Sequence, residues 1–157
     1  MGQWLTGLPF RAILSQNQRE EQLILKVVLD TNLFVAAGFN PRSRSARILG
    51  EVARGALAMA WNDATRGEIR AVLSQIPPLS WERWADLFRE EHRHRGQIHP
   101  ERFSQVPDPD DRKFAALAEA AGATLVSNDA HLLNERQQYD FPILSPGEFW
   151  DSYLEQS

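Results

Sequence analysis

The sequence predicts an α/β fold in which a mostly parallel sheet lies between layers of helices, a three-layer α/β/α arrangement. Short apolar runs alternate along the chain with segments of helical periodicity, which is the pattern of strand–helix–strand units. The clearest run, residues 25–29 (LKVVL), is apolar at four of its five positions, as is typical of a strand covered on both faces. The length of 157 residues suits one domain.

Residues that cap or stop helices set the boundaries in the first half of the chain. We expect strands at residues 25–29 and 56–61, a loop at 38–41, and helices at 45–54, 65–76 and 80–95. Gly55 ends the first of these helices, and Pro77-Pro78 ends the second. Ser80 is the expected N-cap of the third. The apolar stripe of that third helix would consist of Trp81, Trp84, Leu87 and Phe88.

The second half repeats the alternation. A helix is expected to start at Asp108 with Pro109 in its first turn and to end at Gly122, and strands are expected at residues 123–126 and 142–144. The segment that follows has Ser, Pro and Glu at the N-cap, first and third positions of a last helix. Residues 1–24 show weak periodicity, so we expect an N-terminal extension, at most a short helix, before a domain at residues 25–157.

The composition excludes several classes of protein. With no cysteine, disulfides, iron–sulfur clusters, thiolate zinc sites and cysteine nucleophiles are absent. No apolar run approaches the roughly 20 residues of a membrane span, and residues 1–20 lack the pattern of a secretory signal. We therefore expect a cytoplasmic protein without a membrane partner. The net charge of −4 argues against a general polyanion binder.

Acidic residues follow two of the predicted strands. Asp30 comes directly after the first strand, and Asp129 comes shortly after the strand at residues 123–126. In open parallel sheets ligands bind beyond the carboxyl ends of the strands. An acid there also has a structural interpretation, because Asp often caps a turn or a helix. Glu68, at the border of an apolar helical stripe, would by itself be interpreted as a solvated flank residue.

Three acids in four residues, Asp108, Asp110 and Asp111, lie at the start of one predicted helix. Asp108 suits the N-cap, and the other two then lie about 100° apart around the helix axis. Asp111 is three residues before Phe114, so we expect it to point inward and Asp110 to point away. Such a group repels itself unless a cation is near.

These acids could converge in a single carboxylate cluster, although they come from four separate elements. Its members would be Asp30, Glu68, one acid of the group at 108–111, and Asp129. Oxygen ligands of this kind suit Mg²⁺ or Mn²⁺. A divalent ion held there can activate water and bind the oxygens of a phosphodiester.

Five segments, in order, resemble the PIN-domain family. They are VLDTNLFV at 28–35, EIRAVL at 68–73, DPDDRKF at 108–114, LVSNDAHLL at 125–133 and ILSPGEF at 143–149. The resemblance covers residues 25 to about 150. It implies a PIN-like fold and a metal-dependent ribonuclease, and many such proteins are toxins of VapC-like toxin–antitoxin pairs. The partners it implies are an RNA substrate, an antitoxin and a second copy of the chain.

Carried over position by position, the resemblance implies four catalytic and metal-binding acids, namely Asp30, Glu68, Asp111 and Asp129. Asn32 and Ser127 match polar positions that support the acids, with Ser127 standing where Thr is common. One departure is the extension before Leu25, since members of the family often start near the first strand.

Three arginines, Arg42, Arg44 and Arg47, follow the first strand in sequence and could hold RNA phosphates. A solvated loop and helix flank explains them equally well. Without the four site acids the net charge rises from −4 to 0, so the remaining surface is not acidic.

Two other interpretations stay open. One is a non-catalytic PIN-like module that binds RNA or protein. The other is an aspartyl-phosphate phosphatase or receiver, although the chain has Asp30-Thr31-Asn32 where such a phosphatase has Asp-x-Asp. A receiver would also need a Lys after a late strand, and Lys26 and Lys113 lie elsewhere.

Overall fold

The structure, a computed structural model, describes residues 24–156. Its centre is a four-stranded, all-parallel sheet in the order β2-β1-β3-β4. The strands are β1 (Leu25–Leu29), β2 (Leu57–Met59), β3 (Thr124–Val126) and β4 (Ile143–Leu144). Each strand lies within the segment where the sequence predicts one.

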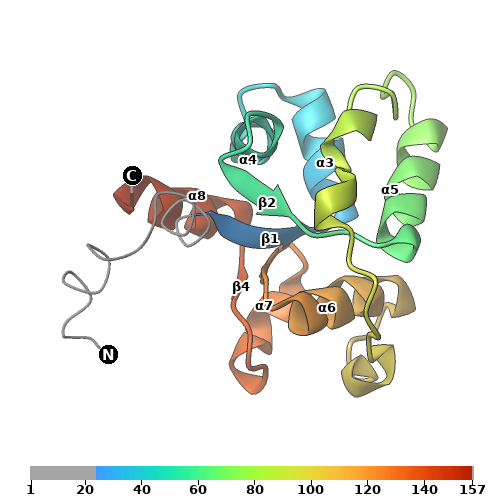
Figure 1. Cartoon of the computed structure of the whole chain (residues 1–157), viewed down its shortest axis with the longest axis vertical. Coiled ribbons are helices and arrows are strands. Elements are labelled where there is room, and N and C mark those ends of the chain that lie inside the picture. Colours follow the sequence, from blue (N-terminus) through green and yellow to red (C-terminus); the bar gives the residue numbers. More distant parts are fainter. Residues whose placement is uncertain (1–23, 157) are drawn as a thin grey trace.

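Helices cover both faces of this sheet, which confirms the three-layer α/β/α prediction. They are α3 (Thr31–Phe39), α4 (Arg44–Ala53), α5 (Asp63–Gln75), α6 (Pro109–Ala121), α7 (Ala130–Asn134) and α8 (Pro146–Glu155). Figure 1 shows α3, α4 and α5 above the sheet and α6 and α7 below it. Helix α8 packs against α4 and β4.

The two central strands are buried as their sequences predict. Val27, Val28 and Leu29 of β1 are at most 2% exposed, and β3 contributes Leu125 and Val126 to the same core. Burial of each such side chain stabilises the fold by about 1.5–3 kcal/mol. This core fixes the carboxyl ends of β1 and β3, and therefore the residues that follow them.

The predicted helix ends are confirmed where a local signal sets them. The Asp108 side chain caps α6 by accepting a hydrogen bond of 2.9 Å from the Asp110 amide. At its other end Gly122 adopts a φ of 65°, a left-handed conformation that glycine enters without strain. Ser145 and Glu148 form the capping box of α8.

One helix, α3, is missing from the sequence predictions. Its residues are apolar on nearly every side, because the helix packs between α4 and α5 as well as on the sheet. A helix buried on several sides has no single apolar stripe, so the period that reveals surface helices is absent. Asp30 caps it by accepting a hydrogen bond of 3.0 Å from the Asn32 amide.

The predicted helix over residues 80–95 is wrong. That segment forms two short 3-10 turns, η1 (Ala85–Leu87) and η2 (Glu90–His92), joined by extended backbone. Trp81 and Trp84 are buried, but they pack around Phe34 and Phe88 in an aromatic cluster rather than along a helix face. Aromatic residues at helical spacing mimic a stripe even where the backbone turns irregularly.

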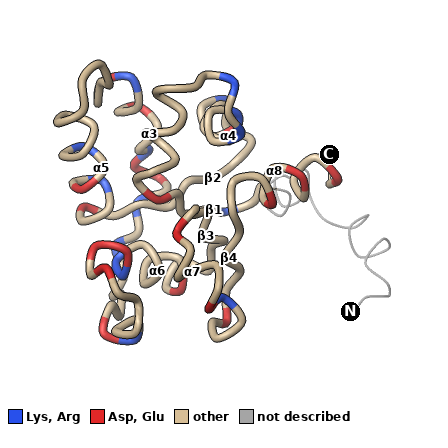
Figure 2. Tube along the Cα trace, turned by 180° about the vertical axis from the view of Figure 1, so that it is seen from behind, with Lys and Arg blue, Asp and Glu red and all other residues tan. Residues whose placement is uncertain are grey.

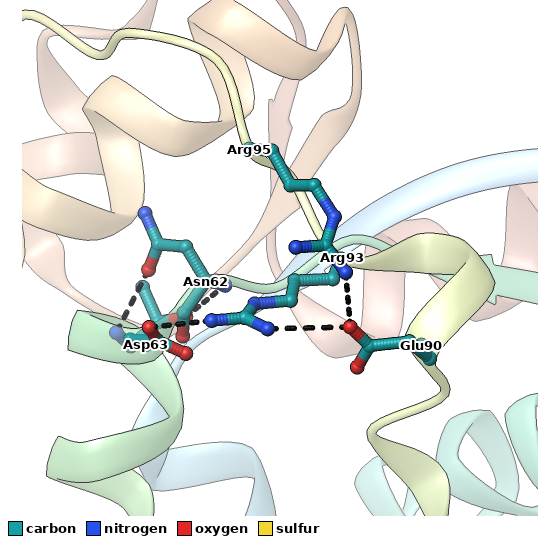
Figure 3. Close-up of polar contacts among 6 residues, drawn as sticks. Asn62, Asp63, Glu90, Arg93 and Arg95 are labelled. Atoms are coloured by element: carbon teal, nitrogen blue, oxygen red, sulfur yellow. Dashed lines mark hydrogen bonds and ion pairs between the residues drawn. The ribbon is translucent and has the colours of Figure 1, made fainter.

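After these turns the chain runs beside the residue that follows β2. The Trp61 amide donates to the His92 carbonyl at 3.4 Å, and the His94 amide donates to the Trp61 carbonyl at 2.7 Å. Figure 3 shows how charged side chains secure this segment, with the Arg93 guanidinium between Asp63 and Glu90. The segment is therefore tied to the start of α5.

Among residues 24–156, no helix is both long and apolar enough to cross a membrane. The prediction for residues 1–24, at most a short helix, lies outside the described residues except for Ile24.

Candidate functional site

Acids gather at the carboxyl edge of the sheet. Asp30 follows β1 and caps α3, Asp129 caps α7 shortly after β3, and Asp111 lies in the first turn of α6. A cavity of about 190 Å³ opens there, and its acidic lining residues are Asp30, Glu68, Asp108, Asp110 and Asp111. In Figure 2, acidic positions mark α5 and the start of α6 on the side of the molecule opposite α8.

Asp30 is the most enclosed of these acids, at 5% exposure. One carboxylate oxygen accepts a hydrogen bond from the backbone amide of Asn32, and the other accepts one from the Ser127 hydroxyl. Burial raises the pKa of Asp30 to about 6, against the opposing effect of these hydrogen bonds, and the charge of Asp129 raises it further. The hydrogen bonds fix the orientation of a carboxylate that is costly to ionise.

Ser127 connects the acids that follow the two central strands. Its hydroxyl donates to Asp30 and accepts a hydrogen bond of 3.0 Å from the Asp129 amide. Asp129 in turn accepts from the Leu132 amide at 2.9 Å. The family resemblance implies a supporting place for Ser127, and its hydroxyl lies between the Asp30 carboxylate and the Asp129 backbone amide.

Asp111 lies beside Asp129, whereas Asp110 is exposed. Helical spacing predicts the inward orientation of Asp111, but Asp110 also lines the acidic cavity instead of pointing away from it. Partial burial raises the pKa of Asp111 to about 7, and the charge of Asp129, a hydrogen bond with it, and the charges of Asp108 and Asp30 add to the effect. Raised pKa values at neighbouring carboxylates show that negative charge is crowded here.

Glu68 also reaches the cavity, but both of its carboxylate oxygens have partners. The Thr31 hydroxyl donates to one oxygen at 2.7 Å, and the Lys113 ammonium contacts the other at 2.5 Å. Partial burial alone would lower the pKa of Lys113, but Glu68 and Asp110 outweigh it, so that pKa is raised. Glu68 is therefore already paired with a cation of the chain.

Thr31 and Lys113 are site residues that the sequence analysis does not single out. In the sequence, Lys113 stands within the DPDDRKF segment and argues against a receiver protein. One signal was available in the sequence, because Lys113 follows Asp110 by three residues and such a pair shares a helical face.

The oxygen donors of these acids suit a hard divalent cation. The side chains are not, however, arranged closely enough to coordinate one. Among residues 24–156, no three His, Cys, Asp or Glu side chains are close enough together to hold a metal ion as they stand. Asp30, Asp111 and Asp129 nevertheless influence one another electrostatically, and all offer the oxygen donors that Mg²⁺ and Mn²⁺ prefer. A cation among them would offset the burial and the repulsion that raise the pKa values of Asp30 and Asp111.

The three arginines proposed to hold phosphates do not reach this cavity. Helix α3 has nine residues and separates their segment from Asp30 by about 13 Å of helix. Arg44 pairs with Asp151 of α8 at 3.9 Å, and none of Arg42, Arg44 and Arg47 lines the acidic cavity. Their geometry favours the interpretation of a solvated loop and helix flank.

Comparison with known proteins identifies the kind of domain. A family profile described as "PIN domain" matches residues 26–131, a range that contains all four proposed acids. No curated protein matches the chain.

Two solved structures share the fold. One is VapBC2 from Rickettsia felis bound to a DNA fragment from its promoter, with 17% identity and a TM-score of 0.51 over 76% of this chain and 97% of that chain. The other is FitAB bound to an IR36 DNA fragment, with 15% identity and a TM-score of 0.51 over 79% and 95% of the two chains. At such identities the likeness concerns the fold alone.

Proposed function

The chain belongs to the PIN domain family, and on this premise we propose that it is a metal-dependent endoribonuclease that hydrolyses phosphodiester bonds of single-stranded RNA. PIN domains are generally nucleases. The observation that carries the proposal is the group of Asp30, Asp111 and Asp129, three acids from separate elements that meet at one edge of the sheet, where burial and the neighbouring carboxylates raise the pKa values of Asp30 and Asp111. Such a group costs stability and is best explained by a cation that it binds.

In this proposal Asp30, Asp111 and Asp129 hold Mg²⁺ or Mn²⁺, which supplies an activated water and stabilises charge on the phosphate when bound. The Ser127 hydroxyl and the Asn32 amide keep Asp30 in one orientation. Glu68 binds metal or orients the attacking water. The Lys113 ammonium adds positive charge beside the site, where a phosphate oxygen gains negative charge during attack.

We also propose that the protein is a cytoplasmic toxin that an antitoxin neutralises, and that it pairs with a second copy of itself. The support is the shared fold with VapBC2 and FitAB, whose structures contain DNA. The PIN family match gives no support to the aspartyl-phosphate alternative. A non-catalytic PIN-like module that binds RNA or protein remains the alternative to be tested.

The test uses the full chain, a labelled single-stranded RNA and either Mn²⁺ or EDTA. We expect cleavage only with the metal, and loss of at least about a hundredfold in Asp30→Asn, more than the 10–100-fold typical of a residue that only supports a ligand. Asp140→Asn is the matched control, because Asp140 is exposed and does not line the acidic cavity. RNA binding without cleavage by the wild type would favour the non-catalytic alternative, and undiminished cleavage by Asp30→Asn would refute the mechanism.

A further inference from the structure

A second polar cavity, of about 200 Å³, is lined by residues of the chain segments that also carry proposed site acids. Pro107 lines it, and the next residue, Asp108, lines the acidic cavity. His131, on the opposite wall, is two residues from Asp129. The two chain segments that carry Asp111 and Asp129 therefore also form the walls of this second cavity, which we call the side pocket.

The walls of the side pocket are fixed by contacts between distant parts of the chain. The Arg112 guanidinium holds the segment before α6 by donating to the carbonyls of Val106 at 2.8 Å and Ser104 at 3.0 Å. The Gln105 amide donates to the Tyr139 hydroxyl at 2.9 Å and so joins the two walls. A pocket held in this way exists before any ligand arrives.

Aromatic packing supports the same wall from behind. The Tyr139 ring lies 5.3 Å from the Phe103 ring and 5.8 Å from the Phe141 ring, measured between centroids. The half-buried Tyr139 ring gives the side pocket an apolar surface on which a flat ring can lie. Its volume is below the roughly 300–1,000 Å³ of pockets for drug-sized ligands, so it suits one small planar group.

The polar atoms of the side pocket include two hydrogen-bond acceptors without a partner among residues 24–156. Within the described part of the chain, the side-chain oxygen of Gln105 and one carboxylate oxygen of Glu135 have no hydrogen-bond partner. The other Glu135 oxygen accepts from the Gln138 amide. A ligand that offers adjacent N–H donors would satisfy these oxygens, whereas one that offers only acceptors would leave them unpaired.

We propose that the side pocket binds one unpaired RNA base next to the phosphodiester held at the acids, and that it selects guanine. This inference rests on the proposed nuclease function. Guanine presents two adjacent donors, N1–H and the 2-amino group, on its pairing edge, and proteins read unpaired bases by that edge and by stacking on aromatic rings. A base held in a duplex cannot present this edge, so the pocket also explains a requirement for single strands.

The test compares short single-stranded RNAs that differ at one nucleotide. Sequencing the ends left on a random RNA pool first locates the cut and any preferred position. Substrates with guanine, inosine, adenine or uracil at that position are then cleaved by the wild type and by the Glu135→Gln and Gln105→Ala variants. Gln137→Ala is the matched control, because Gln137 is exposed and does not line the side pocket.

We expect the wild type to prefer guanine and to lose roughly tenfold in kcat/KM with inosine, which lacks only the 2-amino donor. Glu135→Gln should cleave guanine and inosine substrates equally, with uracil substrates little affected. If a melting curve shows that Gln105→Ala has lost its fold, Tyr139→Phe keeps the ring and removes the hydroxyl that accepts from Gln105.

Two results would overturn the inference while leaving the nuclease proposal intact. The first is wild-type cleavage with no preference for guanine at any position. The second is an unchanged preference for guanine in both Glu135→Gln and Gln105→Ala, or in Tyr139→Phe if Gln105→Ala does not fold. A wild type that cleaves none of these RNAs with Mn²⁺ would instead overturn the proposed function and this inference together.

Discussion

Two groups of charged side chains near the carboxyl edge of the sheet are built in opposite ways. At the start of α5, Arg93 lies between Asp63 and Glu90, and Arg95 contacts Glu90, so acids and bases are matched (Figure 3). These groups are mostly exposed, and ion pairs of this kind contribute little to stability, typically 0–1 kcal/mol. Their place in the structure is to tie one segment to another.

The acidic cavity has the reverse balance. Its lining includes five acids, and Lys113 contacts only Glu68 and Asp110. Asp30 is buried and Asp111 is partly buried, so their charges are not screened as exposed charges are. The comparison shows that a network with equal numbers of acids and bases holds segments of the fold together. A partly buried cluster with an excess of acids costs stability and indicates a function.

The largest expected effect separates the acids at the start of α6. Asp111→Asn should lower RNA cleavage by at least about a hundredfold with little loss of stability, since only the negative charge beside Asp129 is removed from the cluster. Asp110→Asn should change cleavage least, because Asp110 is exposed. Asp108→Ala should cost about 1 kcal/mol as a lost helix cap and keep much of the activity.

Melting curves and cleavage rates of these three variants check the assignment. A greater loss of cleavage in Asp110→Asn than in Asp111→Asn would show that the wrong aspartate is assigned to the metal.

The next effect concerns pH and stability in the absence of metal. The pKa of Asp30 is raised from 3.8 to about 6 in the folded state, so the folded state holds this proton more tightly than the unfolded state. The contribution of this group to the free energy of unfolding is therefore largest below pH 4. It falls by up to about 3 kcal/mol as the pH rises from 4 through 6. Asp111 acts in the same sense, with its pKa of about 7.

Urea denaturation in EDTA between pH 4 and 8 measures this loss. Asp30→Asn should flatten the dependence, and Mn²⁺ at pH 8 should restore the stability. Glu148, whose pKa Arg136 lowers to about 2, loses most of its contribution at lower pH, outside this window. Stability that rises from pH 4 to 8 without metal would contradict the prediction.

A matched pair of substitutions compares the two charged groups directly. Lys113→Met frees Glu68 from its ammonium partner, so Mn²⁺ should bind several times more tightly, as measured by calorimetry. Arg93→Met breaks the exposed pairs with Asp63 and Glu90, and it should change stability by about 1 kcal/mol or less and leave Mn²⁺ affinity unchanged. Equal effects of both variants on Mn²⁺ affinity would remove the distinction between the two groups.

The smallest expected effect is that of the N-terminal extension. Residues 1–24 contain none of the four proposed acids, and we propose that residues 25–157 form the catalytic domain. Deletion of residues 1–22 should leave the cleavage rate within about twofold, in line with the near-neutral effect of changes away from a site. An insoluble or inactive truncated protein would show instead that the extension belongs to the structure of the domain.

The sequence predicts best those elements whose boundaries depend on residues only a few positions away. The apolar run of β1 and the capping residues Asp108 and Ser145 act within a few positions of themselves, and the structure has those elements where they are expected. Helix α3 escapes prediction because its burial between other helices erases its period. The turns that contain Trp84 escape because aromatic packing from several directions imitates a helical stripe.

In the candidate site, too, features set by local spacing are predicted and features set by the packing of distant elements are not. Helical spacing predicts that Asp111 points inward, since α6 is regular and its inward face is fixed by Phe114. The pairing of Glu68 with Lys113 depends on how α5 packs against α6, and no pattern along the chain contains that information. The distance of Arg44 from the cavity follows likewise from the path of α3, which the sequence leaves undetected.

The hydrogen bonds that hold the acids give the protein its own spectroscopic probes. The backbone amide of Asn32 donates to Asp30, that of Leu132 donates to Asp129, and that of Asp129 donates to the Ser127 hydroxyl. Amide proton and nitrogen chemical shifts respond strongly to the charge of the acceptor. An NMR titration with Mg²⁺ would therefore follow the Asp30 and Asp129 carboxylates separately, each through its own amide signal, with no RNA or substitution needed.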